Sequence, residues 1–256
     1  MGKIIAIANQ KGGVGKTTTA VNLSAALAEA GKKVLMIDLD PQGNTTSGLG
    51  GKVNEKNSVY DALMGRTSLG DCIQGTEIKK LKLVGSDIRL AGAEVELVSV
   101  KERESYLKKL LGPARDEYDY LFVDCPPSLS LLTLNALAAA DSVLVPIQCE
   151  YYALEGVSSL MNTINRVKRT FNPHLEIEGI LLTMLDGRTN LGIQVVDQVK
   201  KHFKKEVFAT MIPRNVRLGE APSHGMPINL YDPKSTGAMA YQALAKEVIA
   251  RNKKNK

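Results

Sequence analysis

The sequence predicts an α/β fold: a mostly parallel, twisted sheet with helices on both faces. Three observations lead to this prediction. Strand-like and helix-like segments alternate along the 256 residues. The expected strands are continuous apolar runs, which is typical of parallel strands buried on both faces. A glycine-rich loop joins the first strand to the first helix, at the strand end where such sheets bind ligands.

The elements follow from the hydrophobic pattern taken in chain order. Strands are expected at residues 3–8, 33–38, 81–85, 120–124, 142–147 and 177–183, with a weaker one at 207–209. Helices are expected at residues 17–30, 59–64, 102–115, 131–139, 156–170, 192–203 and 237–251. The polar stretch 40–57 follows the second strand at its ligand end. It is interpreted as a mobile nucleotide-sensing loop, with a plain solvated loop as the alternative.

The chain is expected to form a single domain over residues 1–251, followed by a basic, frayed tail at residues 252–256. It contains no apolar run long enough to cross a bilayer and begins at once with a strand. We therefore expect no transmembrane helix, no signal peptide and a cytoplasmic protein. Cys72, Cys125 and Cys149 lack C-x-x-C spacing and are expected to be small buried residues rather than metal ligands.

The net charge of +6 makes a polyanion such as DNA, RNA or an acidic membrane a suitable partner. Charge alone does not select one of these, because many basic proteins bind no nucleic acid. The lysines near the end of the helix at 192–203 fit both a basic patch and an ordinary solvated helix end; they are Lys200, Lys201, Lys204 and Lys205.

Residues 3–27 place a strand, a glycine loop and a helix in succession, and this order builds a phosphate site. The glycines let the backbone approach an anion, and the amides at the helix start face it. Lys16 is placed to reach the β and γ phosphates of ATP, and Thr17 offers a hydroxyl to Mg²⁺. The residues expected to bind the nucleotide here are Gly12, Gly13, Val14, Gly15, Lys16, Thr17 and Thr18.

Three aspartates end two of the expected strands. Asp124 closes the apolar run 120–124, which is the Walker B arrangement that binds Mg²⁺ through water. Asp38 and Asp40 stand at the end of the second strand, beside the phosphate loop, and we expect them to differ in role.

The loop K-G-G-V-G-K-T departs from the general pattern G-x-x-x-x-G-K-[ST], because Gln10 replaces the first glycine and a second lysine, Lys11, appears early. This form resembles the deviant Walker A signature of the ParA/MinD-type ATPases, within the P-loop NTPase fold. Further segments resemble the bacterial ParA/Soj chromosome-partitioning ATPases over nearly all of residues 1–250; they are IDLDPQGN, VDCPPSL, PIQCEYYALEG, LLTMLDGRTNLG and IPRNVRLGEAPSHGMPI.

The resemblance implies an ATPase that uses ATP and Mg²⁺, forms a sandwich homodimer with ATP and binds double-stranded DNA non-specifically. It also implies a nucleoid-associated protein whose slow hydrolysis is stimulated by a ParB-type centromere-binding partner. Lys11 would reach across the dimer to the partner's nucleotide, where it acts in catalysis together with Lys16. Asp40 would orient the attacking water and contact Mg²⁺ through its water shell.

The same resemblance assigns residues outside the phosphate loop. Arg188 and Arg217 match the positions that family members use for DNA. Pro213 and Arg214 match the segment near the nucleotide base, with Met184 as a neighbour.

Three other interpretations compete with this one. A MinD-type membrane-positioning ATPase shares Lys11 but needs an amphipathic C-terminal helix, whereas the apolar stripe at 241–249 here is better suited to packing on the sheet. An iron–sulfur relative needs paired cysteines, and only Cys125 is suitably placed. A binding module without turnover fits poorly with Lys16, Asp40 and Asp124 together.

Overall fold

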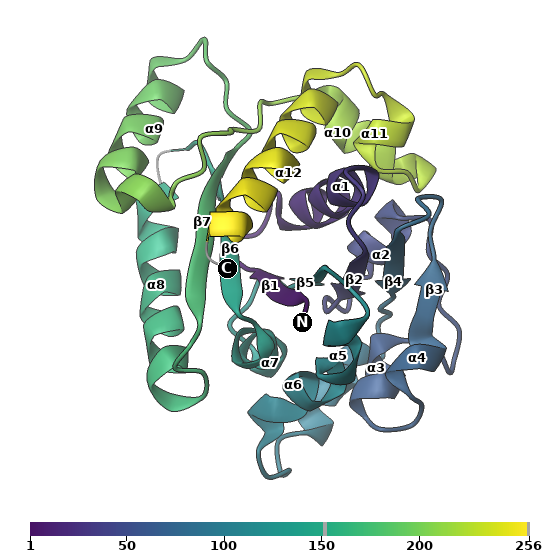
Figure 1. The fold of residues 1–256 in the computed structure, drawn as a ribbon. Helices are drawn as coiled ribbons and strands as arrows, with labels where there is room; N and C mark the ends of the chain where they lie inside the picture. The colour runs from purple at the N-terminus through teal and green to yellow at the C-terminus, as the bar shows by residue number, and fades with distance from the viewer. Residues whose placement is uncertain (151–152, 255–256) are drawn as a thin grey trace.

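A computed structural model describes residues 1–150 and 153–254, and within them the predicted sheet is present. Seven strands form one sheet in the order β3-β4-β2-β5-β1-β6-β7 (Figure 1). All neighbouring strands are parallel except β3 and β4, which confirms the mostly parallel sheet. The strands are β1 (Lys3–Ile7), β2 (Val34–Asp38), β3 (Ile73–Gly75), β4 (Leu81–Val84), β5 (Tyr120–Asp124), β6 (Ser142–Gln148) and β7 (Glu176–Thr183).

Helices cover both faces of this sheet, also as predicted (Figure 1). Successive residues of a strand point to opposite faces. Ile5 and Ile7 therefore join one apolar cluster with α1 and α12, whereas Ile4 and Ala6 join another with α6, α7 and α8. The helices are α1 (Lys16–Glu29), α2 (Asn44–Gly48), α3 (Val59–Leu63), α4 (Leu69–Cys72), α5 (Leu90–Glu96), α6 (Tyr106–Leu111), α7 (Leu131–Ala139), α8 (Ala153–Thr170), α9 (Asn190–Phe203), α10 (Val216–Glu220), α11 (Ile228–Tyr231) and α12 (Thr236–Lys254).

The weak strand predicted at residues 207–209 does not form. Val207 makes only an isolated bridge to Ile180 of β7. The backbone amides of Ala209 and Thr210 donate to the carboxylate of Glu247 in α12, each at 2.9 Å. These two amides are satisfied by a side chain. The next backbone bond to β7 comes only from the amide of Ile212, which donates to the carbonyl oxygen of Leu182 at 2.8 Å, so residues 207–209 form no regular strand.

The single helix predicted at residues 102–115 is also wrong, because the segment breaks into α6 and two flanking 3-10 turns. The side chain of Asn135 in α7 forms hydrogen bonds with two backbone groups of this segment. Its Nδ2 donates to the carbonyl oxygen of Arg103 at 2.8 Å, and its Oδ1 accepts from the amide of Leu107 at 3.2 Å. Pro113 has no amide hydrogen and cannot continue the helix.

The stretch 40–57 is not simply a loop, because it contains α2. A side chain at Gly48 would bring its Cβ to 3.1 Å from Val21, so α2 packs closely on α1. Residues 44–48 of the expected mobile loop therefore form a packed helix, whereas Lys52 and residues 54–56 are exposed. The sequence pattern also missed α4, α5, α10, α11 and β3, which are too short to show a clear hydrophobic period.

The two ends of the chain meet at the amino ends of the strands. Lys3 Nζ lies 2.6 Å from the buried carboxylate of Glu178 and donates to Asn252 of α12 at 2.6 Å. Helix α12 runs to Lys254, so the expected frayed tail at 252–256 is helical up to that residue. Residues 255–256 lie outside the described residues.

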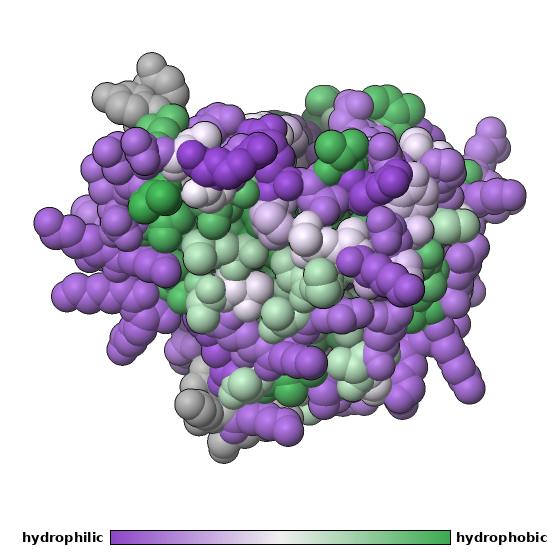
Figure 2. Space-filling view, turned by 90° about the horizontal axis from the view of Figure 1, so that it is seen from above, coloured by the Kyte–Doolittle hydropathy of each residue, from purple (hydrophilic) through white to green (hydrophobic). Residues whose placement is uncertain are grey.

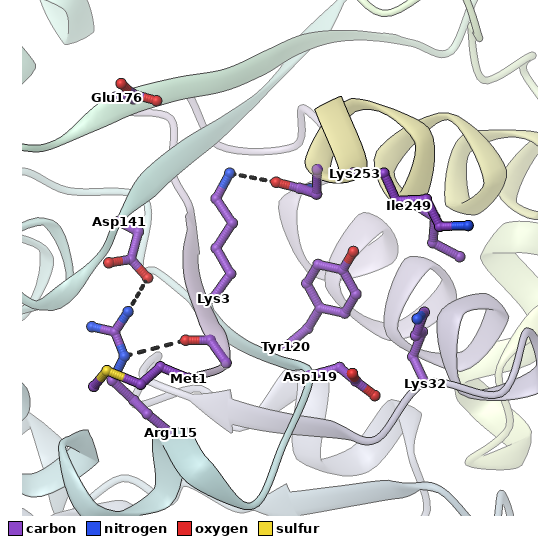
Figure 3. A pocket seen from close by; sticks show the side chains of 12 residues that line it. Met1, Lys3, Lys32, Arg115, Asp119, Tyr120, Asp141, Glu176, Ile249 and Lys253 are labelled. Carbon is purple, nitrogen blue, oxygen red and sulfur yellow. Dashed lines mark hydrogen bonds and ion pairs between the residues drawn. The ribbon is translucent and has the colours of Figure 1, made fainter. Parts of the chain in front are cut away.

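A cavity of about 360 Å³ opens beside this end of the sheet (Figure 3). Lys3, Arg115, Tyr120 and Asp141 are among the side chains that line it, and Arg115 is paired with Asp141 at 2.6 Å. The phosphate loop follows the carboxyl end of β1. This cavity is therefore separate from the expected nucleotide site, at the opposite ends of the strands.

Candidate nucleotide site

The loop between β1 and α1 has the backbone conformation that a phosphate site needs. Gly13 and Gly15 adopt φ angles of 72° and 86°, in the left-handed region that other residues rarely enter. Gly15 is also the N-cap of α1, so it offers no side chain to the amides of the first turn. These amides and the helix dipole are available to an anion.

Two polar side chains that we did not predict anchor this loop to neighbouring strands. The hydroxyl of Thr183, at the end of β7, donates to the carbonyl oxygen of Val14 at 2.9 Å. Asn9 donates from Nδ2 to the carbonyl oxygen of Pro146 at 2.7 Å, and its Oδ1 accepts from the amide of Lys11 at 3.0 Å. Each of these polar residues directly follows a run of apolar strand residues. This pattern is visible in the sequence and could have pointed to them.

The two loop lysines have different environments. Lys16 is buried, and its ammonium donates to the carbonyl oxygen of Lys11 at 3.1 Å. Burial lowers the pKa of Lys16, and the nearby carboxylates of Asp124 and Asp40 oppose that shift. Lys11 instead keeps its side chain 37% exposed and lies 3.5 Å from Glu150.

Thr17 and Asp124, which were both predicted to bind Mg²⁺, lie within hydrogen-bonding distance of each other. The Thr17 hydroxyl donates to Asp124 Oδ2 at 2.9 Å, and the hydroxyl of Thr45 donates to the same oxygen at 2.7 Å. The other oxygen, Asp124 Oδ1, is buried and has no hydrogen-bond partner among the described residues. Burial raises the pKa of Asp124 to about 7, helped by the charge of neighbouring Asp38.

Asp38 and Asp40 occupy different positions, as expected. Asp38 is fully buried and accepts from the amide of Asp40 at 3.2 Å and from the amide and hydroxyl of Thr46 at 2.8 and 2.6 Å. Burial raises the pKa of Asp38 to about 6. Asp40 follows two residues later, beyond the end of β2, and its Oδ1 accepts from the amide of Gln42 at 3.0 Å.

These residues fit a Mg²⁺ ion bound together with nucleotide phosphates. Mg²⁺ prefers oxygen ligands and is bound in such sites by one or two protein groups, phosphate oxygens and waters. Thr17 supplies a hydroxyl, and the unpaired Oδ1 of Asp124 is a buried acceptor that a metal-bound water would satisfy. Thr17 and Asp124 could therefore hold Mg²⁺, and the metal roles of Thr17, Asp40 and Asp124 remain predictions.

A second cavity, of about 460 Å³, lies beside the phosphate loop. Gly15 and Thr18 line one side, and Met184, Pro213 and Arg214 line another. A bridge between Leu185 and Pro213 brings these two segments together. The structure thus gathers all three residues expected near the base, with apolar surface suited to a nucleobase.

The two arginines expected to contact DNA are both exposed and ion-paired. Arg188 pairs with Asp186 at 2.8 Å, and its side chain is 89% exposed. Arg217 pairs with Glu220 at 2.8 Å and lies 3.6 Å from Asp232. Helices α9 and α10, which carry or adjoin these arginines, lie at the same end of the molecule on either side of α12 (Figure 1).

The surface at this end of the molecule is mixed in hydropathy (Figure 2). Seen from above, it shows hydrophilic side chains among apolar and neutral ones (Figure 2). Leu191 and Ile193 of α9 and Val216 of α10 contribute exposed apolar surface.

The apolar stripe of the C-terminal helix is buried, as the sequence indicated. Tyr241, Leu244, Ala245 and Val248 are each at most 1% exposed and pack with α1 in one apolar cluster. Ile249, the last residue of the stripe, is only partly buried against the same cluster. Among the described residues, no helix combines the length and apolar character needed to span a bilayer.

A glycine loop between a parallel strand and a helix, a buried lysine, and a threonine hydrogen-bonded to a strand-end aspartate together define a P-loop nucleoside triphosphatase fold. A protein-family model described as "AAA domain" matches residues 2–177. The chain belongs to this family and, within it, to the ParA/Soj chromosome-partitioning ATPases.

Individual relatives agree with this assignment. The chain is 60% identical over 251 residues to sporulation initiation inhibitor protein Soj of Bacillus subtilis, covering 98% of this chain and 99% of that protein. It is 52% identical over 252 residues to chromosome-partitioning ATPase Soj of Treponema pallidum, covering 98% and 99%. Its fold resembles the structure of cobyrinic acid a,c-diamide synthase from Mycobacterium smegmatis with bound ADP and magnesium, with a TM-score of 0.87, 38% identity and coverage of 100% and 97%.

Proposed function

We propose that this protein hydrolyses ATP to ADP and phosphate, and that ATP binding drives a sandwich dimer that binds DNA non-specifically during chromosome or plasmid segregation. The observation that carries the proposal is the arrangement of Lys16, Thr17 and Asp124 beneath a phosphate loop whose second lysine, Lys11, is partly exposed. A relative named as a chromosome-partitioning ATPase supports the cellular role. The ADP and magnesium bound in the similar M. smegmatis structure support ATP and Mg²⁺ as cofactors.

Hydrolysis would depend on positioning and electrostatics, because phosphoryl transfer leaves little covalent chemistry to the protein. The ammonium of Lys16 neutralises charge on the transferred phosphoryl group. Asp40 is buried beside the loop and orients the attacking water. Thr17 and Asp124 would hold Mg²⁺, which when bound neutralises charge that develops on the phosphate oxygens.

Dimerisation would free Lys11 from its contact within the subunit. The pair between Lys11 and Glu150 is long, at 3.5 Å, and both side chains are partly exposed, at 37% and 46%. Exposed pairs of this kind contribute roughly 0–1 kcal/mol. A partner's nucleotide phosphates therefore offer Lys11 a stronger interaction than the one it gives up.

DNA binding would require a similar exchange of partners. Arg188 and Arg217 already pair with carboxylates, and DNA phosphates would replace those carboxylates. Because both pairs are exposed, the exchange costs little. A dimer doubles the number of arginines on the surface, which explains why ATP would control DNA affinity.

Hydrolysis, stimulated by a ParB-type partner, would then release the dimer from DNA, and the protein would reside in the cytoplasm on the nucleoid. Binding to a fluorescent random-sequence duplex, followed by anisotropy with ATP, with ADP and without nucleotide across a salt series, tests this proposal. Tight, salt-sensitive binding with ATP only is expected. Binding in none of these states, together with ATP-dependent binding to anionic lipid vesicles, would favour the membrane-positioning alternative.

A further inference from the structure

The short helix α2 contacts both buried carboxylates of the site through consecutive threonines. Thr45 donates its hydroxyl to Asp124 Oδ2 at 2.7 Å. Thr46 donates its amide and hydroxyl to Asp38 Oδ2 at 2.8 and 2.6 Å. Thr45 is 0% exposed and Thr46 is 5% exposed, so water does not compete strongly for these bonds.

The bonds to Asp124 are distributed unevenly over its two oxygens. Oδ2 accepts from both Thr45 and Thr17, whereas Oδ1 is buried and accepts from no described residue. Leaving a buried carboxylate oxygen unpaired costs roughly 1–3 kcal/mol or more. Two hydroxyls on one oxygen fix the orientation of the carboxylate, and that orientation keeps Oδ1 available to a ligand.

Thr17 and Thr45 differ in what they can do once a metal binds. Thr17 opens α1 directly after the phosphate loop, so its oxygen is the one suited to Mg²⁺. Thr45 belongs to a different element, and its hydroxyl is directed to the carboxylate. Its part is therefore to hold Asp124 rather than to touch the metal or the phosphates.

We infer that Thr45 is a positioning residue of the Mg²⁺ site: it orients Asp124 so that the free oxygen of this carboxylate accepts from the water shell of the ion. The inference rests on the proposed nucleotide and Mg²⁺ site. Partners that orient metal-binding groups in this way typically change metal affinity 10- to 100-fold when removed.

The position of Thr45 also links the metal site to the segment after Asp40. Helix α2 packs on α1 where a Cβ at Gly48 would lie 3.1 Å from Val21. Helix α2 is also bound to the segment that follows β4, because the Thr46 hydroxyl accepts from the amide of Ser86 at 2.9 Å. Because α2 is held by these contacts, the backbone of Thr45 has a fixed position, which a positioning residue requires.

The variant Thr45→Val tests the inference, because it keeps the branched shape and removes the hydroxyl. Thr46→Val is the control variant: it lies next to Thr45 in α2, is also buried, and loses its side-chain bonds to Asp38 and to the amide of Ser86 instead of a bond to Asp124. The measurement is binding of fluorescently labelled ADP as MgCl₂ is titrated, with binding in EDTA measured separately.

Thr45→Val should need about 10- to 100-fold more Mg²⁺ for half-maximal enhancement of ADP binding, with an ADP affinity in EDTA within twofold of wild type. Thr45→Ser, which keeps a hydroxyl, should restore the wild-type Mg²⁺ midpoint. Thr46→Val should lower the melting temperature yet leave the midpoint within about threefold of wild type.

An unchanged midpoint in Thr45→Val, or equal shifts in Thr45→Val and Thr46→Val, would overturn the positioning role. If Thr45→Val does not fold, Thr45→Ala, which adds no buried methyl group against the carboxylate, decides the question by the same midpoint. Wild-type protein that binds ADP equally well with Mg²⁺ and with EDTA would instead contradict the proposed site itself.

Discussion

Asp38 and Asp124 stand opposite each other at the carboxyl ends of the neighbouring parallel strands β2 and β5. Both are buried, at 0% and 1% exposure. Burial raises the pKa of both carboxyl groups, and the charge of Asp38 raises the pKa of Asp124 further. Two adjacent buried acids are costly in their charged forms unless a cation is present. A cation bound next to this pair would therefore stabilise the two carboxylates in their charged forms.

This pair makes the stability of the nucleotide-free protein depend on pH. An acid whose pKa is raised on folding stabilises the folded state while protonated, and this contribution is lost as the pH rises toward the folded pKa of about 7. Asp124→Asn mimics the protonated form. Its free energy of unfolding, relative to wild type, should therefore increase between roughly pH 4 and pH 7, by at most about 1.4 kcal/mol per pH unit. Urea denaturation in EDTA at several pH values measures this difference, and a difference independent of pH would contradict the assigned shift.

Substitutions of the two loop lysines should have different effects on nucleotide binding and on dimerisation. Lys16→Ala should remove stable nucleotide binding, because the buried ammonium supplies charged hydrogen bonds of roughly 1.5–3 kcal/mol each to phosphates. Lys11→Ala should keep the binding of ADP to the monomer and lose the ATP-dependent dimer. Equilibrium binding of labelled nucleotide and light scattering with ATP measure the two effects. Equal losses of ADP binding in both variants would show that Lys11 acts within its own subunit.

Asp40→Ala should leave ATP bound and trap the dimer, because the residue is expected to orient water rather than to hold the nucleotide. The hydrolysis rate should fall on the order of 10²- to 10⁴-fold. Single-turnover hydrolysis and size-exclusion chromatography with ATP measure these outcomes. A monomeric, ATP-free Asp40→Ala protein would refute the assigned role.

Reversing the charges of Arg188 and Arg217 to Glu should remove DNA binding and spare ATP-driven dimerisation, because both side chains lie on the exposed surface. Arg66→Glu with Arg103→Glu is a matched control, since those arginines also pair with neighbouring carboxylates and the net charge changes equally. Each lost phosphate contact should also reduce the slope of log affinity against log salt by roughly 0.9. Unchanged DNA affinity would place the DNA surface elsewhere.

Much of the fold could be predicted because its signals are local. The apolar strands, the helices at 131–139 and 192–203, and the glycine loop each depend on a few consecutive residues, and the structure reproduces them with small shifts at their ends. The errors have tertiary causes. Asn135 of α7 breaks the helix at 102–115, and Glu247 of α12 takes the amides of the strand expected at 207–209.

The candidate site likewise has one part that local sequence predicts and another that depends on tertiary contacts. The sequence by itself determined the phosphate loop with Lys16 and Thr17, because strand, glycines and helix are contiguous and their spacing alone builds an anion site. Only the tertiary structure decided that Thr45 and Thr17 share one oxygen of Asp124 while the other stays free. These residues are far apart in the chain, and hydrogen bonds between them depend on strand order and on the packing of α2, which no local pattern encodes.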